Sequence, residues 1–478
     1  MLDHETKAEM VEEDIGLTAI FIHQKECFVQ YPYAEYEQRM KSLQVLYDFV
    51  RDYQKEICIA INKDFGSRSH NETLTLEIFP SLECIKYAKK HLKSWMMPRK
   101  HSISKWFFPS KCWVMPQPKG VVGIISPWNY PLFLVIAPLV AALAAGNRVM
   151  LKLSEHTPNC SQLLKEKFAE LFVYSKVAVI TGDAKLGIKF SELVFDHLFF
   201  TGSTAVGKKV YQAASNNLVP VTLELGGKSP AILLENEIKK EFIERILIGK
   251  LINSGQTCIA PDYVWIPQGN NEILLNLSRK IIKNKLTNIL DSNYCSIINK
   301  ENYDRIIYLV REAITKGAVW HPLVEPWFSE QDEVYKIAPG LLLNANHTMA
   351  VMQQEIFGPV IPVMEYNTFG DILRIMQIIP RPLASYIFSH DKVKQKLMIK
   401  NTISGALVIN NTIVHAAQES LPFGGIGTSG IGSYRGRYGF DTFSMLKPVF
   451  KQSKLDIFSK FYPPIKRWQK LLLKYMLK

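Results

Sequence analysis

From residue 120 onward, short β-branched runs alternate with helical patterns, and this alternation restricts the possible fold more than any other feature. Parallel strands need a crossover connection, so strands that alternate with helices predict a mostly parallel, doubly wound sheet. The same pattern resumes at 231 and continues to about 409, so we expect two α/β domains in series. The expected strands are 121–125, 148–151, 177–180, 198–200 and 221–223, and the expected helices are 132–145, 160–172 and a segment after Gly202.

The residues before 120 have a different pattern. Apolar residues at three- and four-residue steps predict one helix over 36–62 and a second over 76–92. The stretch 109–118 has alternating character and is expected to be extended. With 478 residues and 47% hydrophobic content, the chain can bury two or three cores.

The net charge of +13 is concentrated at the C-terminus. From Lys447 to the end there are nine Lys and Arg against one acid, Asp456, so this stretch carries +8 of the total. A fold that binds nucleic acid should spread its basic residues over a folded domain. We therefore expect no nucleic-acid partner.

The tail after Pro464 has the pattern of a basic amphipathic helix. Such a helix can lie on an anionic membrane, although this one is too short and too charged to span it. The alternative is that it packs on a partner subunit or on the surface of the fold. Its basic residues are Lys466, Arg467, Lys470, Lys474 and Lys478, and its apolar stripe is Trp468, Leu471, Leu472 and Tyr475.

The cysteines and the N-terminus bear on the compartment. Seven irregularly spaced cysteines without a CxxC indicate neither a disulfide framework nor a zinc site, so we expect no metal. The first 14 residues are acidic and lack the apolar segment of a signal peptide. The best apolar run, 132–145, is shorter than the roughly 20 residues that a membrane span needs. We expect a cytoplasmic protein, with peripheral membrane contact through the tail as a further option.

One glycine-rich match is expected to be a loop. The stretch 425–430 fits G-x-G-x-x-G, but the dinucleotide fingerprint also needs a preceding strand and a following helix. Here further glycines and the run Ser-Tyr-Arg-Gly at 433–436 follow instead.

Cys258 differs from the other cysteines in its neighbours. Ser254, Gly255, Gln256 and Thr257 are polar or flexible, which places the thiol at a loop or a helix start. A helix N-terminus would favour the thiolate, which is the attacking species. The alternative is a buried core cysteine, the usual state of a lone cysteine. We predict that Cys258 is a nucleophile.

Five segments together resemble the aldehyde dehydrogenase superfamily, in its order and with similar spacing, over about 35–450. They are GVVGIISPWNYP at 120–131, FTGST at 200–204, LELGGKSP at 223–230, SGQTC at 254–258 and EIFGP at 355–359. The resemblance implies an α/β fold of two doubly wound, Rossmann-like domains with a small β oligomerisation or bridging element. It also implies oxidation of an aldehyde to the carboxylic acid with NAD(P).

The resemblance implies three catalytic residues. The Cys258 thiolate would attack the aldehyde carbon, and the side-chain amide of Asn129 with the backbone N–H of Cys258 would stabilise the oxyanion. Glu224 would activate the water that cleaves the thioester, and its burial should raise its pKa toward a useful range. The alternatives are a turn-forming role for Asn129 and a surface position for Glu224.

The resemblance also implies a set of cofactor-binding residues, with NAD as the cofactor and NADP as the alternative. Lys152 and Glu155 would meet the adenosine ribose, where the carboxylate would disfavour a 2′-phosphate. The alternative for these two residues is a plain surface ion pair. The helix that follows Gly202 would face the pyrophosphate. The implied residues are Trp128, Lys152, Glu155, Gly202, Ser203, Gly207, Glu355 and Phe357, of which Trp128 would meet a phosphate and the last two the nicotinamide ribose and ring.

The implied domain organisation has four parts. An NAD(P)-binding domain covers 1–225, with 97–118 contributing to the oligomerisation element, and a catalytic domain covers 226–428. A bridging segment follows at 429–450, and the basic tail occupies 451–478.

The run LPFGGIG at 421–427 and the segments that follow it resemble the class 3 branch, which contains dimeric fatty- and aromatic-aldehyde enzymes. Within it, 124–131 and 145–148 look closest to coniferyl-aldehyde dehydrogenases. This implies a homodimer that oxidises an aromatic aldehyde such as coniferyl aldehyde, or a medium- or long-chain aliphatic one. The alternatives are a CoA-acylating relative and a binding protein that has lost catalysis.

Overall fold

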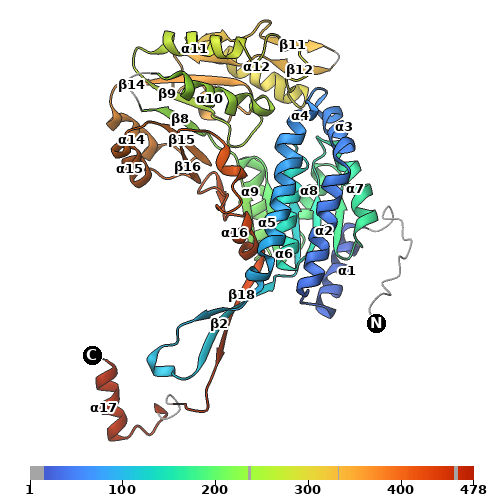
Figure 1. Ribbon diagram of the computed structural model, residues 1–478, viewed down its shortest axis with the longest axis vertical. Helices are drawn as coiled ribbons and strands as arrows, with labels where there is room; N and C mark the ends of the chain where they lie inside the picture. The colour runs from blue at the N-terminus through green and yellow to red at the C-terminus, as the bar shows by residue number, and fades with distance from the viewer. Residues whose placement is uncertain (1–15, 235–237, 332, 457–460, 478) are drawn as a thin grey trace.

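The computed structural model describes residues 16–234, 238–331, 333–456 and 461–477. Figure 1 shows two α/β bodies that meet at the centre of the molecule and a narrow arm that leaves one of them. The larger sheets have six and seven strands, and smaller sheets of three and two strands complete the described part of the chain. These two doubly wound sheets and the small β element confirm the predicted fold class.

The six-stranded sheet lies in the first body. Its strands are β3 (Val121–Ile125), β4 (Arg148–Lys152), β5 (Val177–Ile180), β6 (His197–Thr201), β7 (Val221–Glu224) and β17 (Gly430–Ile431). Their order is β17-β7-β6-β3-β4-β5, and every pair is parallel except β17 with β7. The chain reverses its direction of winding between β3 and β6. In open α/β sheets, ligands bind outside the carboxyl ends of the strands at such a point.

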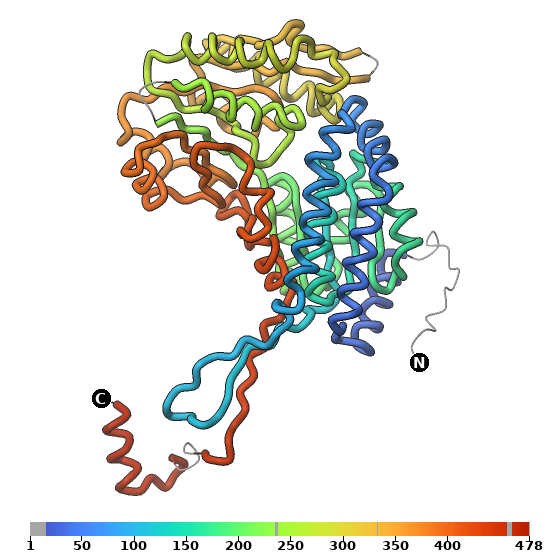
Figure 2. The backbone as a smooth tube through the Cα atoms, in the orientation of Figure 1, coloured from blue at the N-terminus to red at the C-terminus, as the bar shows by residue number. Residues whose placement is uncertain are grey.

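Helices enclose this sheet on both faces (Figure 2). Every residue of the apolar helix α6 is buried, which explains why an apolar run of this length is a core helix and not a membrane span. The helices of this body are α1 (Leu17–Gln30), α2 (Tyr36–Asp52), α3 (Gln54–Phe65), α4 (His70–Thr73), the π-helix η2 (Leu74–Ile78), α5 (Phe79–Met96), α6 (Phe133–Ala145), α7 (Pro158–Leu171), α8 (Ala184–Ser191), α9 (Thr204–Ser215) and α16 (Gly436–Thr442).

The seven-stranded sheet forms the second body. Its strands are β8 (Pro230–Leu233), β9 (Tyr263–Pro267), β10 (Val319–Pro322), β13 (Gly340–Leu343), β14 (Val360–Tyr366), β15 (Ala384–Phe388) and β16 (Ala406–Ile409), and β11 (Phe328–Gln331) pairs separately with β12 (Val334–Ile337). Their order is β10-β13-β14-β9-β8-β15-β16, with only β10 antiparallel to its neighbour. The helices are α10 (Lys240–Leu251), the 3-10 turn η4 (Ile252–Gly255), α11 (Asn271–Lys283), α12 (Lys300–Thr315), α13 (Ala350–Gln353), α14 (Phe369–Ile378), α15 (Lys392–Asn401) and the 3-10 turn η5 (Val414–Ala417).

The arm is a three-stranded antiparallel sheet. It contains β1 (Arg99–His101), β2 (Lys111–Pro118) and β18 (Ser444–Lys451), with the 3-10 turn η3 (Lys105–Phe107) at its tip and helix α17 (Arg467–Met476) beyond it. The central strand β2 pairs with β18 over eight residues, although more than 300 residues separate them in sequence. Figure 2 shows these two segments running side by side away from the body.

Two predictions about the N-terminal helices need correction. The helix expected over 36–62 breaks at Tyr53, whose φ of −101° and ψ of 24° lie outside the helical region. The break lets α2 pack on α5 and α6 while α3 packs on α7. The helix expected over 76–92 begins earlier, as the π-helix η2, and α1 was not predicted. The glycine-rich stretch 425–430 is a loop that ends in β17, as predicted.

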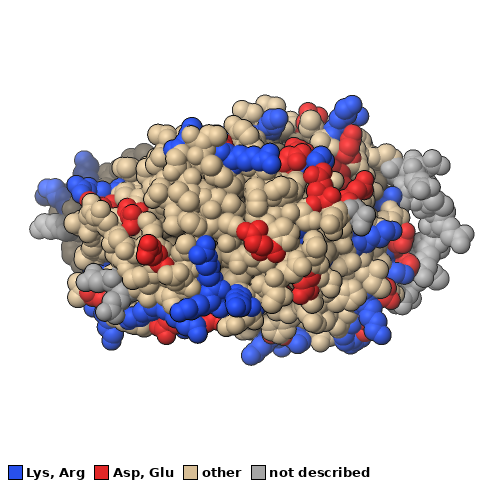
Figure 3. Space-filling view, turned by 90° about the horizontal axis from the view of Figure 1, so that it is seen from above, with Lys and Arg blue, Asp and Glu red and all other residues tan. Residues whose placement is uncertain are grey.

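The surface seen from above mixes basic and acidic side chains and has no single basic face (Figure 3). None of the helices within the described ranges is long and apolar enough to cross a membrane.

Candidate active site

A cavity of about 770 Å³ opens at the carboxyl ends of β3, β6 and β7, where the two bodies meet. Its volume suits a cofactor or a drug-sized ligand. Eight of the eleven predicted site residues line it, whereas Lys152, Glu155 and Gly207 do not. The eight are Trp128, Asn129, Gly202, Ser203, Glu224, Cys258, Glu355 and Phe357.

Cys258 lies in a turn between η4 and β9, partly exposed to the cavity. The backbone before it is unusual because Asn253, Ser254 and Gly255 all have positive φ, at 53°, 49° and 76°. A Cβ at Gly255 would collide with the backbone carbonyl of Gly358, so only glycine fits there. This close approach places segment 254–258 against segment 355–359, two of the segments that carry the sequence resemblance.

Gln256 holds this turn in place through both ends of its side-chain amide. Its Nε2 donates to the carbonyl oxygens of Asn253 at 3.0 Å and Ser296 at 2.9 Å. Its Oε1 accepts from the backbone N–H of Ile298 at 2.9 Å. A buried amide with its hydrogen bonds made fixes the backbone around it, and here it fixes the approach to Cys258.

The electrostatic expectation for Cys258 was wrong. No helix begins at this residue, and burial together with the nearby carboxylates of Glu355 and Glu224 raises the pKa of the thiol to about 12. A thiol with this pKa is protonated at neutral pH. Its attack on a carbonyl carbon therefore requires a proton acceptor close by.

Glu224 is the last residue of β7, and its position explains its chemistry. Its backbone carbonyl accepts from the N–H of Gly202 at 3.0 Å, and the residue pairs with Gly430 of β17 on the other side. The side chain is buried at the cavity wall, and neither carboxylate oxygen has a hydrogen-bond partner among the described residues. Burial raises the pKa of this carboxyl well above its usual value, in the predicted direction.

Asn129 sits in the loop after β3, and this loop is fastened to the turn before Cys258. The Asn129 Nδ2 donates to the carbonyl of Gln256 at 3.1 Å, and the Tyr130 hydroxyl lies 2.6 Å from the Thr257 Oγ1. Asn129 is buried, so its amide has a fixed direction at the cavity wall.

The far wall of the cavity carries Glu355 and Phe357. The Phe357 ring meets the Trp128 ring edge to face, with centroids 5.4 Å apart, and its φ of 51° is unusual for a bulky residue. Burial raises the pKa of Glu355 to about 8, and the neighbouring Asp262 carboxylate raises it too. A Cβ at Gly226 would collide with the Glu355 carboxylate, so a glycine leaves it room.

The first turn of α9 faces the same cavity. Gly202 and Ser203 line it, and the Ser203 hydroxyl caps the helix by accepting from the N–H of Val206 at 3.3 Å. Gly207 is buried against Leu225, so it permits close helix–sheet packing. A helix N-terminus can bind the phosphates of a dinucleotide, and a carboxylate such as that of Glu355 can accept from its ribose hydroxyls, so this lining fits a dinucleotide.

Lys152 and Glu155 lie at the end of β4. The Lys152 Nζ is 3.2 Å from the Glu155 carboxylate and donates to the backbone carbonyl of Leu153 at 2.7 Å. The Lys152 side chain is buried, whereas that of Glu155 is 38% exposed. β4 lies next to β3, where the winding of the sheet reverses, and neither residue lines the main cavity.

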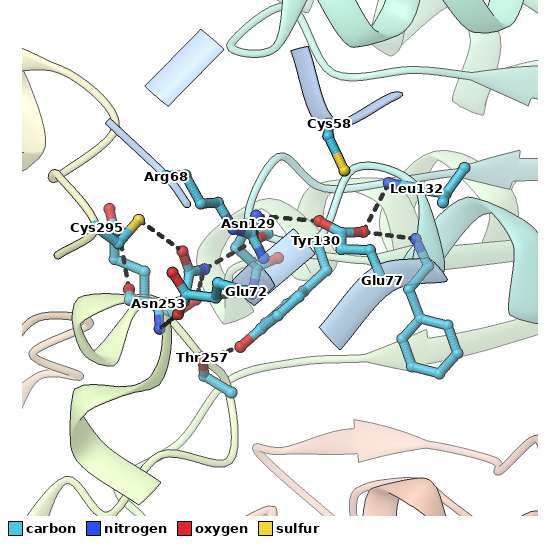
Figure 4. A network of polar contacts seen from close by, with 12 residues as sticks. Cys58, Arg68, Glu72, Glu77, Asn129, Tyr130, Leu132, Asn253, Thr257 and Cys295 are labelled. Carbon is cyan, nitrogen blue, oxygen red and sulfur yellow. Dashed lines mark hydrogen bonds and ion pairs between the residues drawn. The ribbon is translucent and has the colours of Figure 1, made fainter. Parts of the chain in front are cut away.

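Sequence reasoning missed a buried group of charged residues behind the cavity wall (Figure 4). Arg68 and Glu77 form an ion pair at 3.0 Å with both side chains fully buried. Glu72 accepts from the backbone N–H of Asn253 at 2.6 Å. No local pattern marks these residues, because their contacts with Asn129, Leu132 and Asn253 join segments that lie 55 or more residues apart along the chain.

Within the described ranges, no group of three or more His, Cys, Asp or Glu residues could hold a metal ion.

Comparisons with known proteins agree on one family. The profile of the aldehyde dehydrogenase family matches residues 19–449. A probable coniferyl aldehyde dehydrogenase of Pseudomonas aeruginosa is 44% identical over 96% of each chain. Aldehyde dehydrogenase family 3 member H1 of Arabidopsis thaliana is 34% identical, over 92% of this chain and 90% of its own. A solved substrate-bound state of Staphylococcus aureus AldH has a TM-score of 0.90 and 36% identity, covering 97% of this chain and 100% of that one.

The electrostatics of the cavity give a first prediction. At pH 9.5 the Glu355 carboxylate, with its pKa of about 8, is charged and raises the pKa of the Cys258 thiol. Glu355→Gln removes this charge, so the thiolate fraction should rise and iodoacetamide should alkylate Cys258 several times faster. Each unit of pKa corresponds to about tenfold in thiolate. Peptide mass spectrometry measures the rate.

Glu83→Gln is the control, because Glu83 is exposed and pairs with Lys86 on α5. An equal or slower alkylation of Cys258 in Glu355→Gln would contradict the electrostatic coupling.

Proposed function

The chain belongs to the aldehyde dehydrogenase family and oxidises aldehydes with NAD(P), and on this premise we propose which residues act and on which substrate. The observation that carries the proposal is the arrangement of one thiol, one unpartnered carboxylate and one oriented amide on the wall of a single cavity. In this proposal the six-stranded body binds the cofactor and the seven-stranded body carries the nucleophile.

The proposed reaction begins at Cys258. Its thiol loses a proton to a nearby base and the sulfur attacks the aldehyde carbon, giving a thiohemiacetal oxyanion. The Asn129 amide and the backbone N–H of Cys258 stabilise that charge. Fixing this amide in advance matters because a preorganised donor costs no reorganisation during the reaction.

When bound, the nicotinamide accepts the hydride that leaves the aldehyde carbon. The residues proposed to hold the cofactor are Trp128, Lys152, Glu155, Gly202, Ser203, Gly207, Glu355 and Phe357. Glu155 favours NAD, because its carboxylate accepts from ribose hydroxyls and repels a 2′-phosphate.

Glu224 completes the cycle. A thioester on Cys258 must be hydrolysed, and the buried Glu224 carboxylate is placed to take a proton from the attacking water. Its raised pKa makes it a stronger base than an exposed glutamate. The protonated form is inactive in this role, so hydrolysis accelerates as the pH rises through this pKa.

We propose an aromatic aldehyde of the coniferyl type as the substrate. The 44% identity to a probable coniferyl aldehyde dehydrogenase over 96% of both chains supports this choice. Medium- and long-chain aliphatic aldehydes are the second candidates, since the residues of a substrate tunnel vary without disturbing the shared motifs.

A panel of coniferyl, benzylic and long-chain aldehydes with NAD or NADP tests the function. We expect coniferyl aldehyde with NAD to give the highest kcat/KM and the free acid as product. A product that forms only as acyl-CoA would mean that CoA, and not water, cleaves the thioester.

The Cys258→Ala variant tests the nucleophile. It should abolish steady-state NADH formation, while cofactor binding, followed by fluorescence, survives. Retained turnover in this variant would refute the role of Cys258.

Glu224→Gln separates hydride transfer from hydrolysis. We expect a burst of NADH equal to the enzyme concentration, followed by steady-state turnover about 100-fold or more below that of the native chain. Stopped-flow absorbance at increasing pH measures both phases, and in the native chain the slower phase should rise with pH. An unchanged steady-state rate in the variant would remove Glu224 from this step.

We further propose a homodimer that forms through the arm. The arm extends away from the body and exposes large apolar side chains, including Phe108, Met445 and Phe450 at 68%, 55% and 50% exposure. Such residues on a sheet with free edges favour burial against a second subunit.

The tail is proposed to contact an anionic membrane. Helix α17 touches the tip of the arm, where the Tyr475 and Trp106 rings meet at 6.4 Å, yet Leu471 and Tyr475 stay 63% and 66% exposed. Its lysines and Arg467 are exposed beside them. A helix with one basic and one apolar side can lie in the headgroup region.

Sedimentation with anionic vesicles tests the tail. The full chain should sediment with phosphatidylserine vesicles, less so at high salt, whereas a chain that ends at Tyr462 should stay in solution. Neutral phosphatidylcholine vesicles are the control. Equal sedimentation of both chains would contradict membrane contact, and a loss of the dimer on truncation would assign the tail to the partner subunit.

A further inference from the structure

The turn at η2 brings a buried carboxylate to the back of the cavity wall. Residues Leu74–Ile78 form a π-helix between α4 and α5, a rare geometry that is found frequently at functional sites. Glu77 lies in it with its side chain fully buried. Its Oε2 accepts from the backbone N–H groups of Leu132 and Phe133 at 3.0 and 2.8 Å, where α6 begins.

Arg68 extends this contact to the loop that carries Asn129. Its Nη1 is 3.0 Å from the Glu77 Oε1 and donates to the backbone carbonyl of Asn129 at 3.1 Å. The guanidinium also lies over the rings of Phe65 and Tyr130, at 4.9 and 5.1 Å from their centroids. The planar guanidinium is therefore packed against two aromatic rings, and one donor points at Asn129 (Figure 4).

The same carbonyl connects to the turn before Cys258. The Asn253 Nδ2 donates to the carbonyl of Asn129 at 2.9 Å and to that of Gln256 at 3.1 Å. Glu72 in α4 accepts from the backbone N–H of Asn253 at 2.6 Å. Two loops from different bodies of the molecule thus meet the same short stretch, 68–77.

We propose that Arg68, Glu72 and Glu77, here called the buried clamp, are positioning residues that set the direction of the Asn129 amide relative to the Cys258 turn. This inference rests on the proposed function of these two residues. The clamp acts on the backbone of Asn129 and Asn253, and none of its three side chains lines the cavity.

The energetics favour positioning over stabilisation as its role. Burying an ion pair costs desolvation that its attraction often fails to recover, and replacement by apolar residues is frequently neutral. The Arg68 Nε and Nη2 atoms are buried and have no hydrogen-bond partner among the described residues, so this pair is not optimised for stability. What it supplies is a fixed direction for the groups it contacts.

The test uses Glu77→Gln and Arg68→Lys. The first removes the charge of the carboxylate, and the second keeps the cation but cannot span both Glu77 and the Asn129 carbonyl with one planar group. We expect each to lower the single-turnover rate of NADH formation by about tenfold or more, because small displacements of reacting groups have effects of this size. The KM for NAD should stay within twofold.

A double-mutant cycle separates positioning from a general structural effect. If the clamp acts through the Asn129 amide, Glu77→Gln should change the rate by less than about twofold in an Asn129→Ala background. A purely structural role would lower the rate equally in both backgrounds. If Glu77→Gln fails to fold, Arg68→Lys in the same two backgrounds decides the question, because it keeps the buried cation.

Asp196→Asn is the matched control. Its carboxylate also accepts a backbone N–H, that of Val121 at 2.7 Å, and pairs with Lys25 at 2.8 Å, but at the opposite end of β3. It should leave the single-turnover rate unchanged. Rates within twofold of the native chain in the folded clamp variants, or equal losses in both backgrounds, would overturn the proposal. Absence of NADH formation by the native chain would instead refute the proposed function.

Discussion

In a parallel sheet all strands end at the same edge, and this constraint determines where the chemistry of the molecule lies. The loop after β3 carries Asn129, the turn after β6 opens α9, and Glu224 closes β7, so three distant segments meet at one edge. The reversal of winding between β3 and β6 opens the crevice there. The second body completes the cavity with the turn that bears Cys258 and with the wall that carries Glu355 and Phe357.

That cavity holds three groups whose pKa values are raised by burial. The Cys258 thiol, Glu224 and Glu355 line it together, and the two carboxylates also raise the pKa of the thiol. The resting thiol is therefore protonated at neutral pH, and an ionised group must take its proton when the sulfur attacks. The same burial that makes the thiol weakly acidic makes each carboxylate a better proton acceptor, so the two effects are complementary.

Many of the strands and the nucleophile could be predicted from the sequence, because local residue patterns indicate them. Strands such as β3 and β5 follow from β-branched runs, and Cys258 is marked by its polar neighbours. The pKa of that thiol could not be predicted, because it depends on burial in the folded chain and on carboxylates that come from other parts of the sequence. The buried clamp was not predicted for the same reason, since Arg68 and Glu77 look like ordinary residues of an amphipathic region in the sequence alone. The break at Tyr53 was missed because no Gly or Pro marks it.

The three successive left-handed residues before Cys258 also bear on how such a protein can diversify. Asparagine tolerates this backbone region, serine does so less readily, and glycine is required at 255 by the carbonyl that faces it. Few single changes in this turn leave its shape intact, whereas wall residues other than Gly226 and Phe357 carry no such backbone restriction among those described above. Mutation of the wall side chains can therefore change the substrate preference, while the backbone of the turn stays the same.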